Sequence, residues 1–126
     1  MYEITVEDTF DAAHCLPDHE GNCRRLHGHT YRVQARFRFG SVEESGMAID
    51  FRKAKASLRA ILAHMDHQYI NDLPAFAGRN PTAENVAKFI FDEISRKHTS
   101  LHSVSVWETS TSCATYFPEQ PGDQVR

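Results

Sequence analysis

The feature that most constrains this chain is a strict alternation of apolar and polar side chains over residues 29–39. Successive side chains on a strand point to opposite faces of a sheet, so this pattern buries one face and leaves the other wet. We therefore predict a half-buried strand in this segment. Its buried face consists of Tyr31, Val33, Ala35, Phe37 and Phe39.

Three other segments share this period of two. Residues 2–14 alternate over a similar length, and shorter alternating segments lie at residues 103–108 and 114–117. Each is predicted to be a strand, because a pattern with this period fits a half-buried sheet position. The residues after Pro118 are expected to form a frayed tail.

Two helical patterns separate the first and second pairs of strands. Apolar residues recur at spacings of three and four, which places them along one face of a helix. The first helix is predicted to begin after Asp50, acting as N-cap, and to end just before His67. The second should open at Pro81-Thr82 and stop near Lys97. The order predicts an α+β fold with a four-stranded antiparallel sheet and both helices on one face.

Length and composition set further limits. With 126 residues, 40% hydrophobic and 25% charged, the chain is expected to form a single domain over residues 1–126. No apolar run approaches the roughly 20 residues that span a bilayer, and no signal pattern opens the chain, so we expect a cytoplasmic protein. A net charge of -3 with scattered basic residues argues against nucleic acid or membrane as the main partner.

Three of the eight histidines lie where strands begin or end. His27 and His29 are two apart on the predicted second strand, so they share a face with Cα atoms roughly 6.5 to 7 Å apart. His14 closes the first strand and can approach them if the two strands pair. Three histidines leave one tetrahedral position open, which is typical of catalytic zinc.

Two other interpretations of these histidines remain open. They could be core or loop residues satisfied by hydrogen bonds, which is the commoner role of any single histidine. A structural zinc site could instead combine Cys15, Cys23, His27 and His29, although the spacing lacks the short pair of cysteines usual in zinc fingers.

Cys23 has the most reactive setting of the three cysteines. It lies beside Arg24 and Arg25 and four residues before His27, and positive charge favours the thiolate. We expect it to act as a base or nucleophile, with a small buried hydrophobe as the alternative. That alternative suits Cys15 and Cys113 better.

Asp66-His67 and Glu108 are further candidates. An acid beside a histidine can support proton transfer, but sequence neighbours do not usually bond to each other, so the pair alone is weak. Glu108 continues the alternation of the third strand onto its buried face, where a carboxylate needs a partner. A ligand with two N–H donors would satisfy it, as would a salt bridge to Arg24 or Arg52.

Five short motifs can be compared with known families. They are Phe10-x-Ala-Ala-His14, Cys23-Arg-Arg-Leu-His27-Gly-His29, Met65-Asp66-His67, Asn80-Pro81-Thr82-x-Glu84 and Glu108-Thr109. Together these motifs resemble the 6-pyruvoyltetrahydropterin synthase family over residues 2 to about 117. Within that family, the short C-x-x-x-H-G-H spacing is similar to 6-carboxytetrahydropterin synthases of queuosine biosynthesis.

The resemblance implies a tunnelling fold, in which sheets join into a barrel on oligomerisation, commonly as a hexamer built from two trimers. It also implies that Zn²⁺ is the cofactor and that the protein acts as a lyase on a pterin triphosphate. The implied site residues are His14, His27 and His29 for zinc, Cys23 as proton acceptor, Asp66-His67 as relay across a subunit interface, and Glu108 with Thr109 for the pterin.

The implied reaction converts 7,8-dihydroneopterin triphosphate to 6-carboxy-5,6,7,8-tetrahydropterin, with release of acetaldehyde and triphosphate. The alternatives are 6-pyruvoyltetrahydropterin synthase, a dihydroneopterin aldolase-type activity, or a non-catalytic pterin-binding or structural zinc module. Two positions depart from the family pattern, since Cys15 replaces a basic residue and Trp107 replaces a common lysine. The candidates for the triphosphate are Arg24, Arg25, Arg52 and Lys53.

Overall fold

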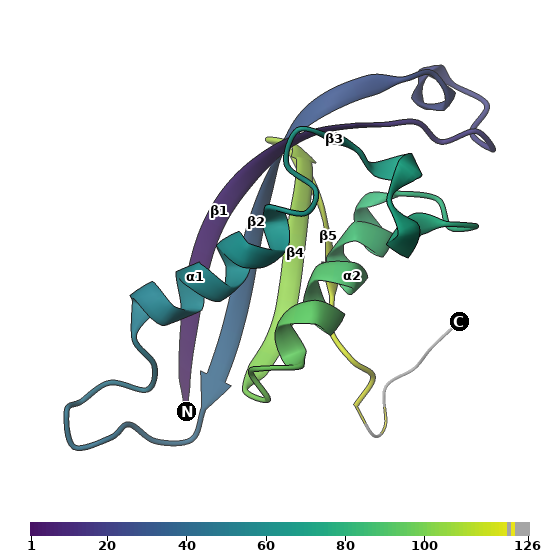
Figure 1. Ribbon diagram of the computed structural model, residues 1–126. Helices are drawn as coiled ribbons and strands as arrows, with labels where there is room; N and C mark the ends of the chain where they lie inside the picture. Colours follow the sequence, from purple (N-terminus) through teal and green to yellow (C-terminus); the bar gives the residue numbers. More distant parts are fainter. Residues whose placement is uncertain (121, 123–126) are drawn as a thin grey trace.

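The computed structural model describes residues 1–120 and 122, and both predicted helices lie across the same face of a curved sheet (Figure 1). The expected tail after Pro118 falls partly outside the described residues. No helix in the described part of the chain is long and apolar enough to cross a membrane. The elements are β1 (Tyr2–His14), β2 (His27–Phe39), α1 (Phe51–Leu62), β3 (Gln68–Tyr69), α2 (Ala83–Ser95), β4 (Leu101–Thr109) and β5 (Ser112–Tyr116), with 3-10 turns η1 (Asn22–Arg24), η2 (Ile70–Asp72) and η3 (Pro74–Phe76).

The sheet has five strands in the order β3-β1-β2-β4-β5. The prediction of four antiparallel strands was therefore wrong at one edge, where the two-residue β3 pairs in parallel with Ala12 and Ala13 of β1. The backbone N–H of His67 donates to the carbonyl of Asp11 at 2.6 Å, which draws the chain after α1 against β1. Two residues are too few to show a hydrophobic period, so the sequence could not reveal this strand.

Side chains cap both helices at their predicted first turns. The Asp50 carboxylate accepts from the backbone N–H of Arg52 at 2.8 Å, and the Thr82 hydroxyl accepts from that of Asn85 at 3.2 Å. These bonds satisfy N–H groups that have no partner within the helix. The first helix ends at Leu62 rather than just before His67, because residues 63–67 form turns.

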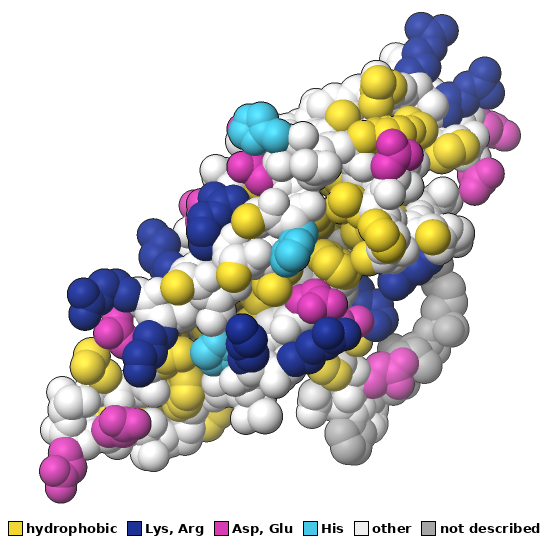
Figure 2. All heavy atoms as spheres, in the orientation of Figure 1, with side chains coloured by type: hydrophobic (Ala, Val, Ile, Leu, Met, Phe, Trp, Pro, Cys, Tyr) yellow, Lys and Arg dark blue, Asp and Glu magenta, His cyan; other side chains and the backbone are white. Residues whose placement is uncertain are grey.

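The core fills the space between the helices and the alternating apolar face of the sheet. Tyr31, Phe37, Leu58 and Ile90 are fully buried there. The opposite face of β1 and β2 is polar and carries ion pairs such as that between Arg38 and Glu3. On the helix-bearing side, Figure 2 shows acidic and basic side chains intermixed over the surface. The alternation predicted from the sequence thus sets which face the helices cover.

Replacing Leu58 with alanine should destabilise the fold by about 2–5 kcal/mol, because the change leaves a cavity between α1 and the sheet. Urea unfolding followed by circular dichroism measures the loss. Lys53→Ala, an exposed change on the same helix, should stay within about 0.5 kcal/mol of the parent protein. Equal losses in both variants would mean that Leu58 does not stabilise the fold through core packing.

Candidate active site

Three imidazoles converge at the end of the β1–β2 pair that extends beyond the helices (Figure 1). His14, the last residue of β1, pairs directly with His27, the first residue of β2, and His29 follows on the same face. The three residues offer ring nitrogens that all lie within 4.8 Å of one another. The Nε2 atoms of His14 and His27 are 2.9 Å apart.

The outer nitrogens of two of these rings are already used. Nδ1 of His14 donates to the carbonyl of Pro81 at 2.8 Å, and Nδ1 of His27 donates to that of Arg25 at 2.7 Å. Carbonyl oxygens only accept, so in the neutral rings both Nε2 atoms carry lone pairs. Two lone pairs that face each other at 2.9 Å repel unless a cation lies between them.

A metal ion fits this donor set. The Nε2 atom of His29 is buried and has no hydrogen-bond partner among the described residues. Tetrahedral zinc with Zn–N bonds of about 2.0–2.1 Å holds its nitrogens about 3.4 Å apart, so small side-chain shifts would suffice. The carbonyls on His14 and His27 supply the outer hydrogen bonds that usually orient metal-binding imidazoles.

Burial keeps two of the rings neutral. His14 is fully buried, and desolvation lowers its pKa and that of His29 below the ordinary value of 6.5. The nearby Glu108 carboxylate opposes this effect by raising both pKa values. Because the neutral imidazole is the form that binds metals, the lowered pKa favours binding at neutral pH.

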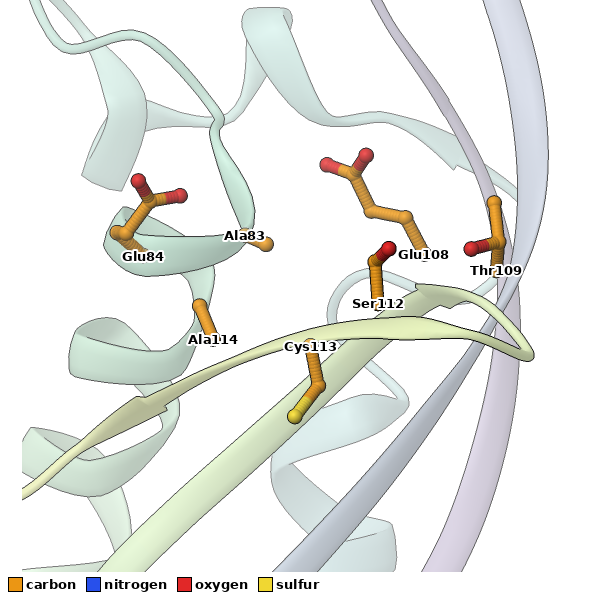
Figure 3. Close-up of a pocket in the computed structure, with 7 residues that line it drawn as sticks. All are labelled: Ala83, Glu84, Glu108, Thr109, Ser112, Cys113 and Ala114. Carbon is orange, nitrogen blue, oxygen red and sulfur yellow. The ribbon is translucent and has the colours of Figure 1, made fainter.

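Glu108 connects the histidines to a neighbouring pocket of about 430 Å³. Its Oε2 lies 3.9 Å from Nε2 of His29, and its side chain is 28% exposed. Figure 3 shows its carboxylate and that of Glu84, from the first turn of α2, on opposite sides of the pocket. Glu108 therefore lies against His29 and forms no salt bridge to Arg24 or Arg52 within the described residues. The pocket is lined by Ala83, Glu84, Glu108, Thr109, Ser112, Cys113 and Ala114.

Sequence reasoning assigned no binding role to Glu84 and Ser112. Glu84 belongs to a recognised motif, but its position in the first turn of a helix has an ordinary capping explanation. Ser112 follows a tight β4–β5 turn, so only the folded hairpin brings it beside Glu108. Thr109, which was a predicted ligand contact, lines the same pocket.

Asp66 and His67 contact each other, which sequence adjacency alone did not lead us to expect. Nδ1 of His67 lies 3.1 Å from Oδ1 of Asp66. His67 has a φ of 59°, a left-handed conformation uncommon outside glycine. The backbone of Asp11 holds this turn, since it accepts from His67 N–H and donates to Asp66 at 3.0 Å. The Asp11 bond is the main reason that the pKa of Asp66 is lowered.

The structure does not bring His67 into the histidine group. His67 is largely exposed and lines a separate pocket with Asp11, Gly28, His29 and Thr30. Asp11 and Thr30 face away from the helices by the alternation of their strands. The imidazole of His67 is therefore presented toward the outer side of the sheet.

Cys23 lies in η1, within the loop at the far tip of the β1–β2 pair (Figure 1). Its carbonyl accepts from the backbone of Leu16 at 2.7 Å, and its thiol is outside the histidine group. Arg24 and Arg25 share this tip, whereas Arg52 lies in the first turn of α1, at the opposite end of the molecule. One chain therefore does not gather all the basic candidates for a triphosphate.

The alternative of a small buried hydrophobe, which suited Cys15 and Cys113 better than Cys23, does not describe Cys113 and describes Cys15 only in part. Cys113 is exposed, because it faces away from Glu108 on the edge strand β5 (Figure 3). Cys15 is half-buried, and its Sγ lies 3.0 Å from the hydroxyl of Tyr69. The side chain of Asn71 also bonds both backbone groups of Cys15, at 2.9 and 3.0 Å. These contacts fix the chain as it leaves His14.

His27→Ala is expected to abolish stoichiometric zinc binding while the chain stays folded, because His27 is partly exposed and outside the apolar core. Metal content after dialysis, together with circular dichroism, measures both effects. His64→Ala removes an exposed histidine outside the group and is the control. Full zinc content in His27→Ala would show that the metal binds elsewhere.

Without metal, stability should fall as the pH drops below about 6.5. The folded chain holds His14 and His29 at lowered pKa, so the unfolded chain binds more protons in this range, and acid favours unfolding. The contribution of the neutral His14 and His29 rings to stability is fully present above 6.5, the ordinary pKa of these histidines in the unfolded chain. Urea midpoints between about pH 7.5 and about pH 5.5, with a chelator present, measure the slope. His29→Gln should have a flatter slope, and parallel slopes would contradict the assignment.

The sequence and fold match known proteins over nearly the full chain. The family profile for 6-pyruvoyl tetrahydropterin synthase matches residues 3–119. A 6-carboxy-5,6,7,8-tetrahydropterin synthase from Synechocystis is 42% identical, with 93% of this chain and 94% of that protein covered. One from Haemophilus influenzae is 35% identical, with 92% and 99% covered.

The fold agrees with these sequence matches. The structure of 6-pyruvoyl tetrahydropterin synthase from Caenorhabditis elegans superposes with a TM-score of 0.84 at 28% identity, covering 94% of this chain and 98% of that one. The resemblance found from the sequence motifs is therefore confirmed. The chain belongs to the 6-pyruvoyl tetrahydropterin synthase family.

Proposed function

We propose that the protein is a zinc-dependent lyase that converts 7,8-dihydroneopterin triphosphate to 6-carboxy-5,6,7,8-tetrahydropterin, with release of acetaldehyde and triphosphate. The observation that carries this proposal is the convergence of three imidazoles beside the carboxylate of Glu108. The names of relatives at 42% and 35% identity support the choice of product. We further propose that residues 1–126 act as one domain in the cytoplasm and serve queuosine biosynthesis.

In this proposal His14, His27 and His29 hold zinc through the nitrogens that face one another. Zinc bound there would make an oxygen ligand more acidic and stabilise negative charge on it. The carbonyls of Pro81 and Arg25 keep two of the rings oriented with their lone pairs inward. The chain therefore supplies a rigid set of neutral donors with room for a further ligand.

Glu108 is the proposed anchor for the pterin ring. A pocket of about 430 Å³ is large enough for a bicyclic ring, and one carboxylate can accept two parallel N–H bonds. The 3.9 Å separation from His29 would place a ligand held by Glu108 next to the histidines. Thr109 offers a hydroxyl in the same pocket.

Cys23, Asp66 and His67 are the proposed proton-transfer groups. The contact of 3.1 Å lets Asp66 orient the ring of His67 and stabilise its protonated form. His67 is presented toward the outer side of the sheet. We therefore propose that His67 of one subunit reaches the zinc and Cys23 of a neighbouring subunit. Cys23 would accept a proton from a side-chain carbon of the substrate.

The sheet edges support assembly. At one edge of the sheet, β3 pairs only with Ala12 and Ala13, so most of β1 has no strand partner along that edge. The other edge is formed by β5. Natural proteins normally pair or cover such edges. We propose that β1 and β5 edges of neighbouring copies pair into a barrel, in a hexamer built from two trimers.

The second candidate function is formation of 6-pyruvoyltetrahydropterin. It is favoured by the structural match, at a TM-score of 0.84, to the 6-pyruvoyl tetrahydropterin synthase from Caenorhabditis elegans. A dihydroneopterin aldolase-type activity and a non-catalytic zinc or pterin-binding role are the remaining alternatives. The enzymatic candidates differ in the products that they form from the triphosphate substrate, and the non-catalytic role forms none.

Incubating the zinc-loaded protein with 7,8-dihydroneopterin triphosphate should yield 6-carboxytetrahydropterin and acetaldehyde, identified by mass spectrometry and an aldehyde assay. Cys23→Ala should lower turnover by about 100-fold or more with zinc still bound, since general base catalysis contributes about 10²–10⁴-fold. Ser41→Ala, which truncates a small polar side chain in the exposed loop before α1, should leave turnover unchanged.

Release of a pyruvoyl product would favour the second candidate function. Loss of zinc in Cys23→Ala would instead support the structural zinc site. An absence of turnover in the wild-type protein with zinc bound would count against all the enzymatic assignments.

A further inference from the structure

Tyr31 is fully buried, yet its hydroxyl has no hydrogen-bond partner. Within the described part of the chain, only two buried side-chain atoms lack partners, the hydroxyl of Tyr31 and Nε2 of His29. Burial of an unpaired polar group is unfavourable, and each such case in a folded protein calls for an explanation. A phenylalanine would fill this place without that cost.

The two unpaired atoms belong to neighbouring positions on one face of β2. Residues two apart on a strand lie roughly 6.5 to 7 Å apart at Cα, and the rings of Tyr31 and His29 have centroids 5.4 Å apart. The ring of His14 lies 5.8 Å away on the same side. The phenol is therefore part of the wall around the histidine group.

The ring of Tyr31 is held firmly in this place. It stacks on Phe10 with centroids 4.7 Å apart and planes inclined by 6°. Both histidine rings meet it nearly edge-on, at 76° for His29 and 88° for His14. Because the packing fixes the ring, the position of the phenol oxygen is set before any ligand arrives.

The register of the sheet brings a carboxylate close to the same phenol. Arg32, which follows Tyr31, pairs with Trp107, which precedes Glu108. Glu108 also contacts His29 at 3.9 Å. The space near the phenol is thus bordered by histidine nitrogens on one side and by a carboxylate on the other.

We propose that the hydroxyl of Tyr31 donates a hydrogen bond to the oxygen ligand of a metal ion held by His14, His27 and His29. A phenol can donate one hydrogen bond, and the open position beside three histidines takes a water or hydroxyl oxygen. Both unpaired atoms then gain partners from one event, since the metal satisfies His29 and its oxygen ligand satisfies Tyr31. Tyr31 is a positioning residue in this role, which rests on the metal-binding part of the proposed function.

Tyr31→Phe is the test, because it removes the hydroxyl and keeps the stacking on Phe10. Without metal, the variant should unfold at the same temperature as the wild-type protein or higher. The hydroxyl of Tyr31 has no hydrogen-bond partner, so its removal leaves no other polar group unpaired. With Zn²⁺, its affinity in competition with a chelator should fall about 10–100-fold, as for other groups that support metal ligands.

Tyr116→Phe is the matched control, since it removes the same atom from a phenol on the edge strand β5. Its zinc affinity should equal that of the wild-type protein. Equal zinc affinity in Tyr31→Phe, a lower unfolding temperature of its metal-free form, or no zinc binding by the wild-type protein would each overturn the inference.

The zinc affinity and the unfolding temperature do not depend on pterin chemistry. A protein that forms no pterin product but loses zinc affinity in Tyr31→Phe would refute the proposed reaction and support the role of Tyr31. Turnover of the substrate by the wild-type protein, together with unchanged zinc affinity in Tyr31→Phe, would support the proposed reaction and refute the role of Tyr31.

Discussion

The pairing of His14 with His27 across β1 and β2 is the constraint on which the candidate site depends. A slip of one residue would turn the side chains of one strand to the other face, and His14 would leave the group. The long apolar face beneath the helices prevents that slip, because it would expose residues such as Phe10 and Val6. Core packing far from the site therefore fixes the positions of the three histidines.

The entrance to α2 links the histidine group with the ligand pocket. The carbonyl of Pro81 holds Nδ1 of His14, Thr82 caps the helix, and Ala83 and Glu84 line the pocket beside Glu108. This first turn thus orients His14, a candidate metal ligand, and also shapes the pocket beside Glu108. Displacement of this turn would change both, so the helix cap contributes to the site as well as to the fold.

Local periodicity was enough to predict four strands, two helices and the shared face of His27 and His29, because each follows from backbone geometry. Contacts between distant segments were not predictable in this way. β3 has only two residues, and the left-handed turn at His67 depends on bonds to Asp11. The environments of two cysteines also depend on such contacts, since an edge strand exposes Cys113 and Tyr69 supplies a partner for Cys15.

The two faces of the sheet divide the candidate chemistry. The histidines and Glu108 lie on the side that the helices cover, where burial keeps imidazoles neutral and strengthens electrostatic contacts. Asp66 and His67 lie at the edge of β1 beside Asp11, where His67 is exposed. An exposed imidazole can exchange protons with water, which a fully buried imidazole such as that of His14 cannot do. A chain with this division can bind and polarise a ligand on one face, and it leaves the proposed proton-transfer pair exposed to a second subunit of the proposed assembly.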